Sequence, residues 1–543
     1  MKQSRFSPRV TALHAAISFA ALMAGVSLGH AQASQPGWVS VSACTPAGPL
    51  IPTNTTESCG SDVLQPILAG LVTTDAKTGA IIEDLAEAIT TTDNKTWTIK
   101  LRKGRKFHDG SEVLAKNFVD AWNWAAYGPN GQSNNDWFSV VIGYGDLNPK
   151  APKGEKPPVP ATNRMSGLKV TGDHEFQVEL RIPVPVFRAQ LSYKAFYPMP
   201  DSFFTDPGAF GRKPIGAGPF QFVSGTPETG YKLAAFAGYA GPAKPSIKGI
   251  DLRIYTSREA AYNDLVAGNL DLLRDIPASK LVADLWKRDL RGRAVVQPRA
   301  NIQALGMPFT DANPQLLKPA IRQALSMAID RKAIVDILFN GIGQPATGWV
   351  PPGVEGYQPG ACGEYCTFDP VKAKELLAKA GGYKGDLKLY YAGDSEVKSA
   401  MDAVCNSIQN TLSITCVTSA LSDNATFRSY TRSGKADGPF PSNWTMDYPS
   451  IDNALIPLYS KDGTSNKGAY ESAAFDALMD KAATEASAAA IKTYQEAERL
   501  LTAEMPRVPL WNPAMTVGHS PKVRSVTLYA NGRIDYSASS LKD

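Results

Sequence analysis

The stretch Leu85–Trp124 reads LAEAITTTDNKTWTIKLRKGRKFHDGSEVLAKNFVDAWNW, and it decides the fold class. Residues Thr96–Leu101 alternate polar and apolar side chains, as in a strand with one buried face. Residues 103–110 contain two glycine-bearing turn signals. From about Ser111 the apolar spacing becomes helical, with one apolar side made by Phe118, Trp122 and Ala125. The sequence therefore predicts a strand, a basic turn and an amphipathic helix.

Further elements of this kind follow along the chain. They are the turn Gly216-Ala-Gly-Pro-Phe220, the run I-R-Q-A-L-x-x-A-I-D-R from Ile321, and D-P-x-x-A-K-x-L-L-x-x-A-G from Asp369. Together with the T-W-T-I-K-L-R-K-G strand and the F-H-D-G turn at Phe107–Gly110, they resemble the signature of bacterial oligopeptide- and dipeptide-binding proteins. These proteins are the extracellular solute-binding subunits of ABC importers. The resemblance extends from about Leu50 to Trp511.

The resemblance implies an α/β protein with the two-lobed periplasmic-binding-protein (Venus flytrap) fold, of the large type with an extra domain. Alternating strands and helices agree with that class. The predicted division is a signal peptide at 1–33, lobe I at 34–70, 201–300 and 512–543, an extra domain at 71–200, and lobe II at 301–511. The chain is expected to cross between the lobes around Arg299–Met307 and Arg507–Trp511, where closure would hinge.

The N-terminal segment has the order of a secretory signal. The cations Lys2, Arg5 and Arg9 precede an apolar run at Val10–Leu28, and Ala31-Gln32-Ala33 follows. Cleavage is expected after Ala33, which would place the protein in the periplasm or at the cell surface. The rival interpretation is a membrane anchor, but the run reaches the length of a span only when several polar residues are counted.

Composition and charge argue against some partners. Of the 543 residues 43% are hydrophobic and 20% are charged, which is ordinary for a globular protein. Without Lys2, Arg5 and Arg9 the 56 basic residues become 53 against 51 acidic residues, a net charge of +2. We therefore expect no nucleic-acid partner.

All six cysteines lie after the signal segment, in three pairs of sequence neighbours: Cys44 and Cys59, Cys362 and Cys366, Cys405 and Cys416. An even set in an exported protein indicates disulfides. Six cysteines allow fifteen connectivities, and pairing between sequence neighbours is the favoured one. A zinc site at Cys362 and Cys366 is the alternative, but no histidine has ligand spacing, so no metal or cofactor is predicted.

Cys44 has a further alternative. Val41-Ser-Ala-Cys44 resembles a lipoprotein cleavage box. The box would begin well beyond the apolar run, and residues 38–41 have the pattern of a first strand. Lipidation would also leave Cys59 without its neighbour.

Three helical segments are expected elsewhere. Pro319–Asn340 predicts a pair of helices with Asp330 as a cap between them. Ser472–Glu504 predicts one long helix. The spacing of Val63, Ile67 and Leu71 predicts a third helix near the start of the mature chain.

The ligand site is expected at Ser442–Pro449. The resemblance implies that Trp444-x-x-Asp447 lies on the cleft face of a lobe, where the aspartate meets the α-ammonium of a peptide. A buried carboxylate needs a cation, and a strand edge can pair with a peptide of any sequence. The predicted ligand-binding residues are Trp444, Met446, Asp447, Asn443, Ser58 and Trp511. The alternatives are a solvated turn for Asp447 and core packing for Trp444, and Asn443 stands where glycine is common in the family.

The predicted function is capture of an oligopeptide by a monomeric protein that delivers it to a membrane permease. Within the same class, the alternative ligands are an oligosaccharide, which would need aromatic platforms, or a metal chelate. From other classes, a secreted hydrolase or a surface adhesin would use the fold differently. The chain has no G-x-S-x-G, H-E-x-x-H or P-loop motif, so no enzyme is predicted.

Overall fold

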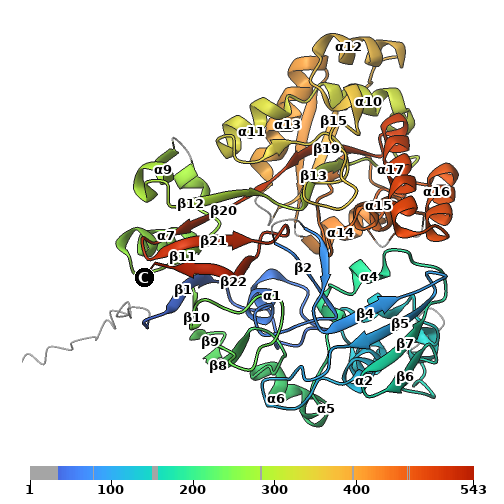
Figure 1. Cartoon of the computed structure of the whole chain (residues 1–543). Helices are drawn as coiled ribbons and strands as arrows, with labels where there is room; N and C mark the ends of the chain where they lie inside the picture. The colour runs from blue at the N-terminus through green and yellow to red at the C-terminus, as the bar shows by residue number, and fades with distance from the viewer. Residues whose placement is uncertain are drawn as a thin grey trace, which may run out of the picture. The chain divides into compact units, whose positions relative to one another are not determined.

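Three sheets organise the computed structural model of the chain, which describes residues 35–76, 79–149, 157–281, 284–393, 397–422, 424–461, 463 and 465–542. The predicted signal peptide and its cleavage site lie outside these residues. Figure 1 shows the five-stranded sheet around β13 and β19 in the upper half, and the other two sheets below it. The elements around the sheets are named lobe I (seven strands), the extra domain (four strands) and lobe II (five strands).

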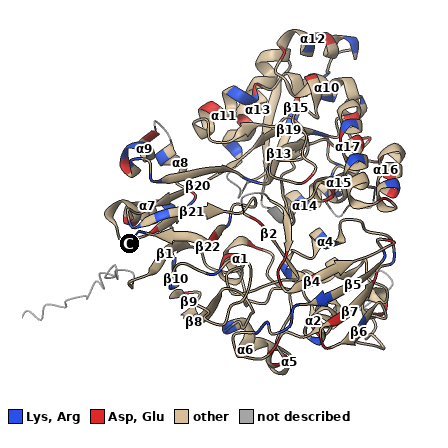
Figure 2. Ribbon diagram, in the orientation of Figure 1, with Lys and Arg blue, Asp and Glu red and all other residues tan. Residues whose placement is uncertain are grey.

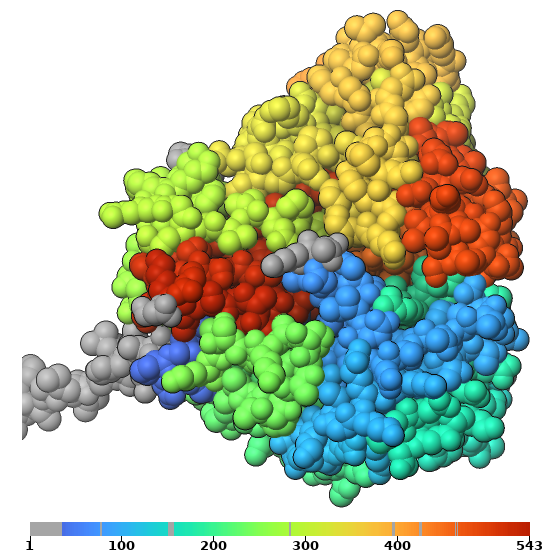
Figure 3. Space-filling model, in the orientation of Figure 1, coloured from blue at the N-terminus to red at the C-terminus, as the bar shows by residue number. Residues whose placement is uncertain are grey.

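Lobe I is assembled from segments far apart in the sequence. Its strands, in spatial order, are β12 (Ala294–Pro298), β20 (Ala514–His519), β11 (Leu272–Arg274), β1 (Trp38–Ala43), β10 (Gly249–Ile254), β9 (Gly230–Ala235) and β8 (Phe220–Thr226). A C-terminal hairpin, β21 (Val523–Leu528) and β22 (Ile534–Leu541), packs on the same core. In Figure 3 this red C-terminal segment lies between green segments from the middle of the chain.

The extra domain contains the stretch from which the sequence prediction began. Its antiparallel sheet has the order β4 (Ala86–Thr90), β5 (Thr96–Leu101), β7 (Glu175–Glu179) and β6 (Leu168–Gly172). Helix α2 (Ala115–Ala126) covers it, with Phe118, Trp122 and Ala125 fully buried. The predicted strand and helix are therefore confirmed, although the helix begins at Ala115 rather than near Ser111. A separate hairpin, β2 (Val72–Thr74) and β3 (Ile81–Glu83), precedes the sheet.

Lobe II is built on β13 (Asn301–Gly306), which lies between β19 (Arg507–Asn512) and the short strands β17 (Phe440–Pro441) and β18 (Trp444–Thr445). Strand β14 (Gln344–Pro345) pairs with β19, and β15 (Leu387–Ala392) pairs in parallel with β16 (Cys416–Leu421). Its longer helices are α10 (Pro319–Met327), α11 (Arg331–Phe339), α12 (Pro370–Lys379), α13 (Lys398–Leu412), α14 (Asn424–Arg432), α15 (Ile451–Tyr459), α16 (Ala473–Ala483) and α17 (Ser487–Glu504).

The remaining helices belong to lobe I and the extra domain. They are α1 (Ser58–Leu64), α3 (Tyr144–Leu147), α4 (Phe187–Gln190), α5 (Asp201–Thr205), α6 (Pro207–Arg212), α7 (Arg258–Ala267), α8 (Ala278–Leu281) and α9 (Leu285–Leu290). Short 3-10 turns occur at η1 (Gly128–Asn130), η2 (Asn135–Phe138), η3 (Lys194–Phe196), η5 (Pro314–Leu317) and η6 (Gly363–Cys366). None of the helices in the described residues is long and apolar enough to span a bilayer.

Two of the predicted helices differ in the structure. The segment Ser472–Glu504 forms two helices, α16 and α17, and not one. The break at residues 484–486 lets their apolar faces pack on each other, with Phe475 and Met479 on α16 and Tyr494 and Leu501 on α17 buried in one core. Helix α1 ends at Leu64, so Ile67 and Leu71 are buried outside it; Pro66 lies directly after the helix and cannot donate a backbone hydrogen bond. The helix pair at Pro319–Asn340 is confirmed, and Asp330 caps α11 by accepting from the backbone N–H of Ala333.

Two neighbouring chain segments connect lobes I and II. One runs from Pro298 to Asn301, and the other crosses at Pro513, between β19 and β20. The backbone N–H of Arg299 donates to the carbonyl of Pro513 at 3.0 Å, so the two crossings are bonded to each other. The second crossing lies just beyond the predicted Arg507–Trp511. Those five residues and Asn512 form β19, which belongs to the lobe II sheet. The residue boundaries of the domains remain a prediction.

The three disulfides join sequence neighbours, as predicted: Cys44–Cys59, Cys362–Cys366 and Cys405–Cys416. Cys44 directly follows β1, and its partner lies in the first turn of α1. Figure 2 shows basic and acidic residues interspersed over the helices of both halves.

Candidate ligand-binding cleft

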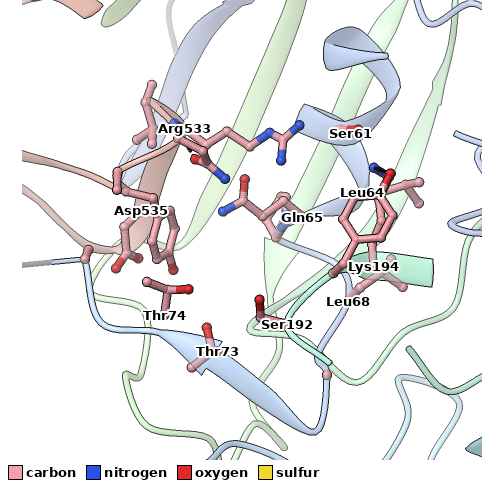
Figure 4. A pocket seen from close by; sticks show the side chains of 18 of the residues that line it. Ser61, Leu64, Gln65, Leu68, Thr73, Thr74, Ser192, Lys194, Arg533 and Asp535 are labelled. Atoms are coloured by element: carbon pink, nitrogen blue, oxygen red, sulfur yellow. Dashed lines mark hydrogen bonds between the residues drawn. The ribbon is translucent and has the colours of Figure 1, made fainter. Parts of the chain in front are cut away.

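A cavity of about 750 Å³ lies between lobe I, the extra domain and lobe II. Its walls include the loop into α1, the hairpin strand β2, the turn at Ser192–Lys194, the loop after β18, and the C-terminal hairpin around Arg533. Figure 4 shows the side chains of Gln65, Thr73, Ser192, Lys194, Arg533 and Asp535 around this space. A cavity of this size accommodates a small ligand rather than a long chain.

Asp447 supplies the carboxylate of the lobe II wall. It follows β18 and is half-buried, and its backbone N–H donates to Oδ1 of Asn453 at 2.9 Å. Burial raises the pKa of Asp447 to about 6, although the Asn453 amide and the charges of Lys194 and Arg533 act in the opposite direction. No cation lies within ion-pair distance of Asp447 among the described residues. The side chain is therefore a desolvated carboxylate that a ligand cation would stabilise.

Asn453, on α15, connects Asp447 to Trp444. Its Oδ1 also accepts from the indole Nε1–H of Trp444 at 3.2 Å, and its Nδ2 donates to Oδ2 of Asp447 at 3.5 Å. Trp444 is half-buried against the lobe II core and is not among the residues that line the cavity. Its contact with Asn453 braces the loop on which Asp447 lies. Sequence analysis missed Asn453, whose only signal was its position shortly after the W-x-x-D motif.

The other predicted ligand-binding residues are divided between the cavity and its surroundings. Ser58 and Met446 line the cavity together with Asp447. Asn443 is exposed, and Trp511 is buried in β19 with its ring 5.5 Å from that of Phe339; neither lines the cavity. The structure thus brings Ser58, Met446 and Asp447 together and leaves Asn443, Trp444 and Trp511 outside. A role for any of the six in binding remains a prediction.

Cationic side chains that sequence analysis missed lie on the lobe I and extra-domain side of the cavity. Lys194, Arg274, Arg299 and Arg533 all line it. The carboxylate of Asp62, on α1, forms ion pairs with both Arg274 and Arg533. The four cationic residues are spread over 339 positions of the sequence, and none of them stands in a motif. The cleft therefore presents Asp447 on the lobe II side, and on the other side cations together with further carboxylates such as Glu57 and Asp535.

The same residues offer no arrangement for a metal. Within the part of the chain that the structure describes, no three His, Cys, Asp or Glu side chains are grouped so that they could hold a metal ion. No histidine or cysteine is among the described residues that line the cavity. The chemistry that the cleft offers is the binding of charged and hydrogen-bonding groups.

Comparison with known proteins agrees with this architecture. The chain is 25% identical over 450 residues to the glutathione-binding protein GsiB of Shigella boydii, covering 80% of this chain and 81% of that protein. It is 25% identical over 504 residues to the oligopeptide-binding protein OppA of Bacillus subtilis, covering 88% of each. The unliganded open form of the periplasmic murein tripeptide-binding protein MppA superposes with a TM-score of 0.78 at 20% identity, covering 94% of this chain and 98% of that one.

A family model supplies the assignment. The model of bacterial extracellular solute-binding proteins, family 5, matches residues 80–466, which is more than half of the chain. Proteins of this family bind solutes and are not enzymes, and the two-lobed fold with an extra domain is the one described above. The chain belongs to the bacterial extracellular solute-binding proteins of family 5.

Proposed function

We propose that the protein captures short peptides outside the cytoplasmic membrane and delivers them to the permease of an ABC importer. The observation that carries this proposal is Asp447, a desolvated carboxylate with a raised pKa that lines a cavity between two lobes. A peptide with a free N-terminus brings an ammonium group to such a carboxylate, and the pair then needs no water. The protein acts as a monomer, since one chain contains the whole cleft.

The size of the cavity supports short ligands. Its volume of about 750 Å³ falls within the range of pockets that enclose small molecules. The relatives described above are named for ligands of this kind, glutathione and a murein tripeptide, besides oligopeptides. We therefore infer that peptides of a few residues fit best.

An oligosaccharide is the second candidate, because several tyrosines line the cavity. Tyr239, Tyr448 and Tyr536 are at most 8% exposed, so their faces are closed to a sugar. Tyr193 is stacked on Trp137, with ring centroids 4.4 Å apart. These rings offer few open platforms for a pyranose, which favours the peptide.

The test is calorimetric titration of the protein with a neutral tripeptide, its N-acetylated form and a trisaccharide. Peptide binding that N-acetylation weakens strongly, without measurable trisaccharide binding, is the expected result. Equal affinity for the free and acetylated peptides would contradict the role of Asp447. Binding of the trisaccharide alone would show that the ligand is a sugar and not a peptide.

We further propose that the bound peptide is not cleaved. The described lining residues include no histidine or cysteine that could serve as base or nucleophile. Incubation of the protein with a mixed peptide pool should leave every mass unchanged. Cleavage that persists after repurification of the protein would contradict this expectation.

A further inference from the structure

Lys194 is a cleft lysine without an anionic partner. It lies in η3, half-buried, and its side chain lines the cavity. Its Nζ lies 4.6 Å from the centroid of the Tyr193 ring and 3.5 Å from the Tyr193 hydroxyl, both uncharged groups. Among the described residues, no carboxylate lies within ion-pair distance of it. An ammonium in such surroundings has lost water without gaining an anion.

These surroundings disfavour the charged form of Lys194. Burial lowers the pKa of Lys194 to about 7, and repulsion by Arg533 acts in the same direction, while Asp447 and Glu57 only partly offset it. About half of the molecules would therefore carry a charge on Lys194 at neutral pH. An anion beside the ammonium would restore the charge.

Arg533 faces the same part of the cavity with spare donors. Its Nε lies 3.3 Å from Oδ1 of Asp62, but Asp62 is shared with Arg274. One carboxylate thus serves two guanidinium groups, so Asp62 does not use all the donors of Arg533. Figure 4 shows Arg533 and Lys194 reaching into one pocket, with Gln65 and Ser61 beside them.

We propose that Lys194 and Arg533 form a carboxylate-binding subsite, which holds an anionic group of the ligand while Asp447 holds its ammonium. This inference rests on the proposed peptide-binding function and narrows it to peptides that carry a carboxylate close to the N-terminus. That carboxylate is either the C-terminus of a very short peptide or an acidic side chain. Both sources present the same chemistry to the two cations.

Three tripeptides with free N-termini separate the sources. Alanyl-glutaminyl-alanine amide has no carboxylate, alanyl-glutaminyl-alanine has only the C-terminal one, and alanyl-glutamyl-alanine amide has only the side-chain one. At least one carboxylate peptide should bind about ten- to hundredfold more tightly than the uncharged amide. The tighter of the two identifies the source.

Substitutions test whether Lys194 carries this preference. Lys194→Met keeps the length of the side chain and should reduce the difference in Kd between the carboxylate peptide and the uncharged amide to a fewfold. Lys194→Arg should retain most of this difference. Lys374→Met is the matched control, because Lys374 is exposed on α12 and away from the cavity. It should discriminate as the unmodified protein does.

Proton uptake gives an independent measurement. Because the pKa of Lys194 is about 7, a carboxylate that binds there should draw in about half a proton per ligand at pH 7. Calorimetry in buffers of different ionisation enthalpy measures the number of protons taken up, and this number should fall by about half a proton in Lys194→Met.

The outcomes separate this inference from the proposed function. If all three peptides bind equally, or if Lys194→Met keeps the full discrimination, the subsite is overturned while peptide binding stands. If none of the peptides binds to the unmodified protein, the proposed function fails and the subsite with it.

Discussion

His108 and Gly216 exchange two hydrogen bonds across the boundary between the extra domain and lobe I. The backbone N–H of His108 donates to the carbonyl of Gly216 at 2.8 Å, and the backbone N–H of Gly216 donates to Nδ1 of His108 at 3.2 Å. On the other side of the ring, Nε2 lies 3.0 Å from the carbonyl of Gly218. Nδ1 therefore accepts and Nε2 donates, which fixes the neutral ring in one tautomer. The F-H-D-G turn and the G-x-G-P-F turn are thus bonded to each other.

This arrangement predicts a loss of stability in acid. Burial lowers the pKa of His108 to about 4 from an ordinary value of 6.5. Between these values the unfolded chain binds a proton that the folded chain does not, so the free energy of unfolding falls as pH decreases from about 6.5 to 4. The contribution of His108 is up to about 3 kcal/mol.

The measurement is the midpoint of thermal unfolding against pH for the unmodified protein and for His108→Gln. The variant should unfold at a lower temperature at pH 8, and the gap should narrow as the pH falls to 4.5. Parallel curves would show that the neutral ring of His108 does not contribute to the acid sensitivity.

The sequence predicted local structure well where one motif decided it. The period-2 strand at Thr96–Leu101, the cap at Asp330 and the neighbour disulfides needed no information from elsewhere in the chain. The break between α16 and α17 was missed because residues 484–486 contain neither glycine nor proline. Only tertiary packing of the two apolar faces explains why the chain turns there.

The site was predicted less completely for a physical reason. Asp447 was found because it stands in a motif, and it does line the cavity. Lys194 and Arg533 are brought to the same cavity by the fold, across 339 positions of sequence, and a single lysine or arginine in a loop carries no signal of its own. Trp444 was expected as a ligand wall, whereas the structure places it against Asn453, behind the loop.

Asp447→Asn should weaken peptide binding without unfolding the protein. The substitution keeps the shape and removes the charge that would meet the α-ammonium. Loss of one partner of an enclosed charge pair typically costs on the order of 2–5 kcal/mol, or roughly thirty-fold to several-thousand-fold in Kd. N-acetylation of the peptide should cost a similar amount, and the two losses should not add. Calorimetry on the four combinations measures the coupling; fully additive losses would place the ammonium elsewhere.

The same carboxylate predicts the pH dependence of binding. Because burial raises the pKa of Asp447 to about 6, the group becomes neutral as the pH decreases through that value. Affinity for alanyl-glutaminyl-alanine amide, which has a free N-terminus and no carboxylate, should therefore fall at pH 5 relative to pH 7.5. Asp447→Asn should lose most of this dependence, and an unchanged slope in the variant would contradict the assignment.

Removal of the Cys44–Cys59 disulfide should affect both stability and binding. The bond closes a loop with a sequence separation of 15, for which loop-closure entropy predicts a loss of about 3 kcal/mol. It also holds the start of α1, where Glu57 and Ser58 line the cavity. The double variant Cys44→Ala, Cys59→Ala should unfold at a lower temperature and bind a neutral tripeptide several-fold more weakly.

The control for this prediction is the double variant Cys362→Ala, Cys366→Ala. That bond spans a separation of only 4 and lies away from the cavity. The expected loss of stability is smaller, about 2 kcal/mol, and the Kd should not change. Equal weakening of binding in both double variants would mean that removal of Cys44–Cys59 weakens binding through a general loss of stability and not through a local change at the cleft.

Two hydrogen bonds between the extra domain and lobe II predict slow release of the ligand. Nδ2 of Asn94 donates to the carbonyl of Glu485 at 2.7 Å, and the hydroxyl of Ser487 donates to the carbonyl of Pro185 at 2.9 Å. Both join the extra domain to lobe II, so a motion that separates these two parts must break both. Each contributes about 1 kcal/mol to the arrangement in which the two parts are bonded.

Loss of both should therefore speed dissociation of a bound tripeptide about thirty-fold. Asn94→Gly suits the positive φ of 56° at this position, and Ser487→Ala removes only the hydroxyl. The matched control is Ser246→Ala, which removes a 2.6 Å hydrogen bond to the carbonyl of Ser539 within lobe I. Stopped-flow measurement of the dissociation rate should show acceleration in the double variant and none in the control. Unchanged dissociation in the double variant would mean that these two bonds do not restrain release of the ligand.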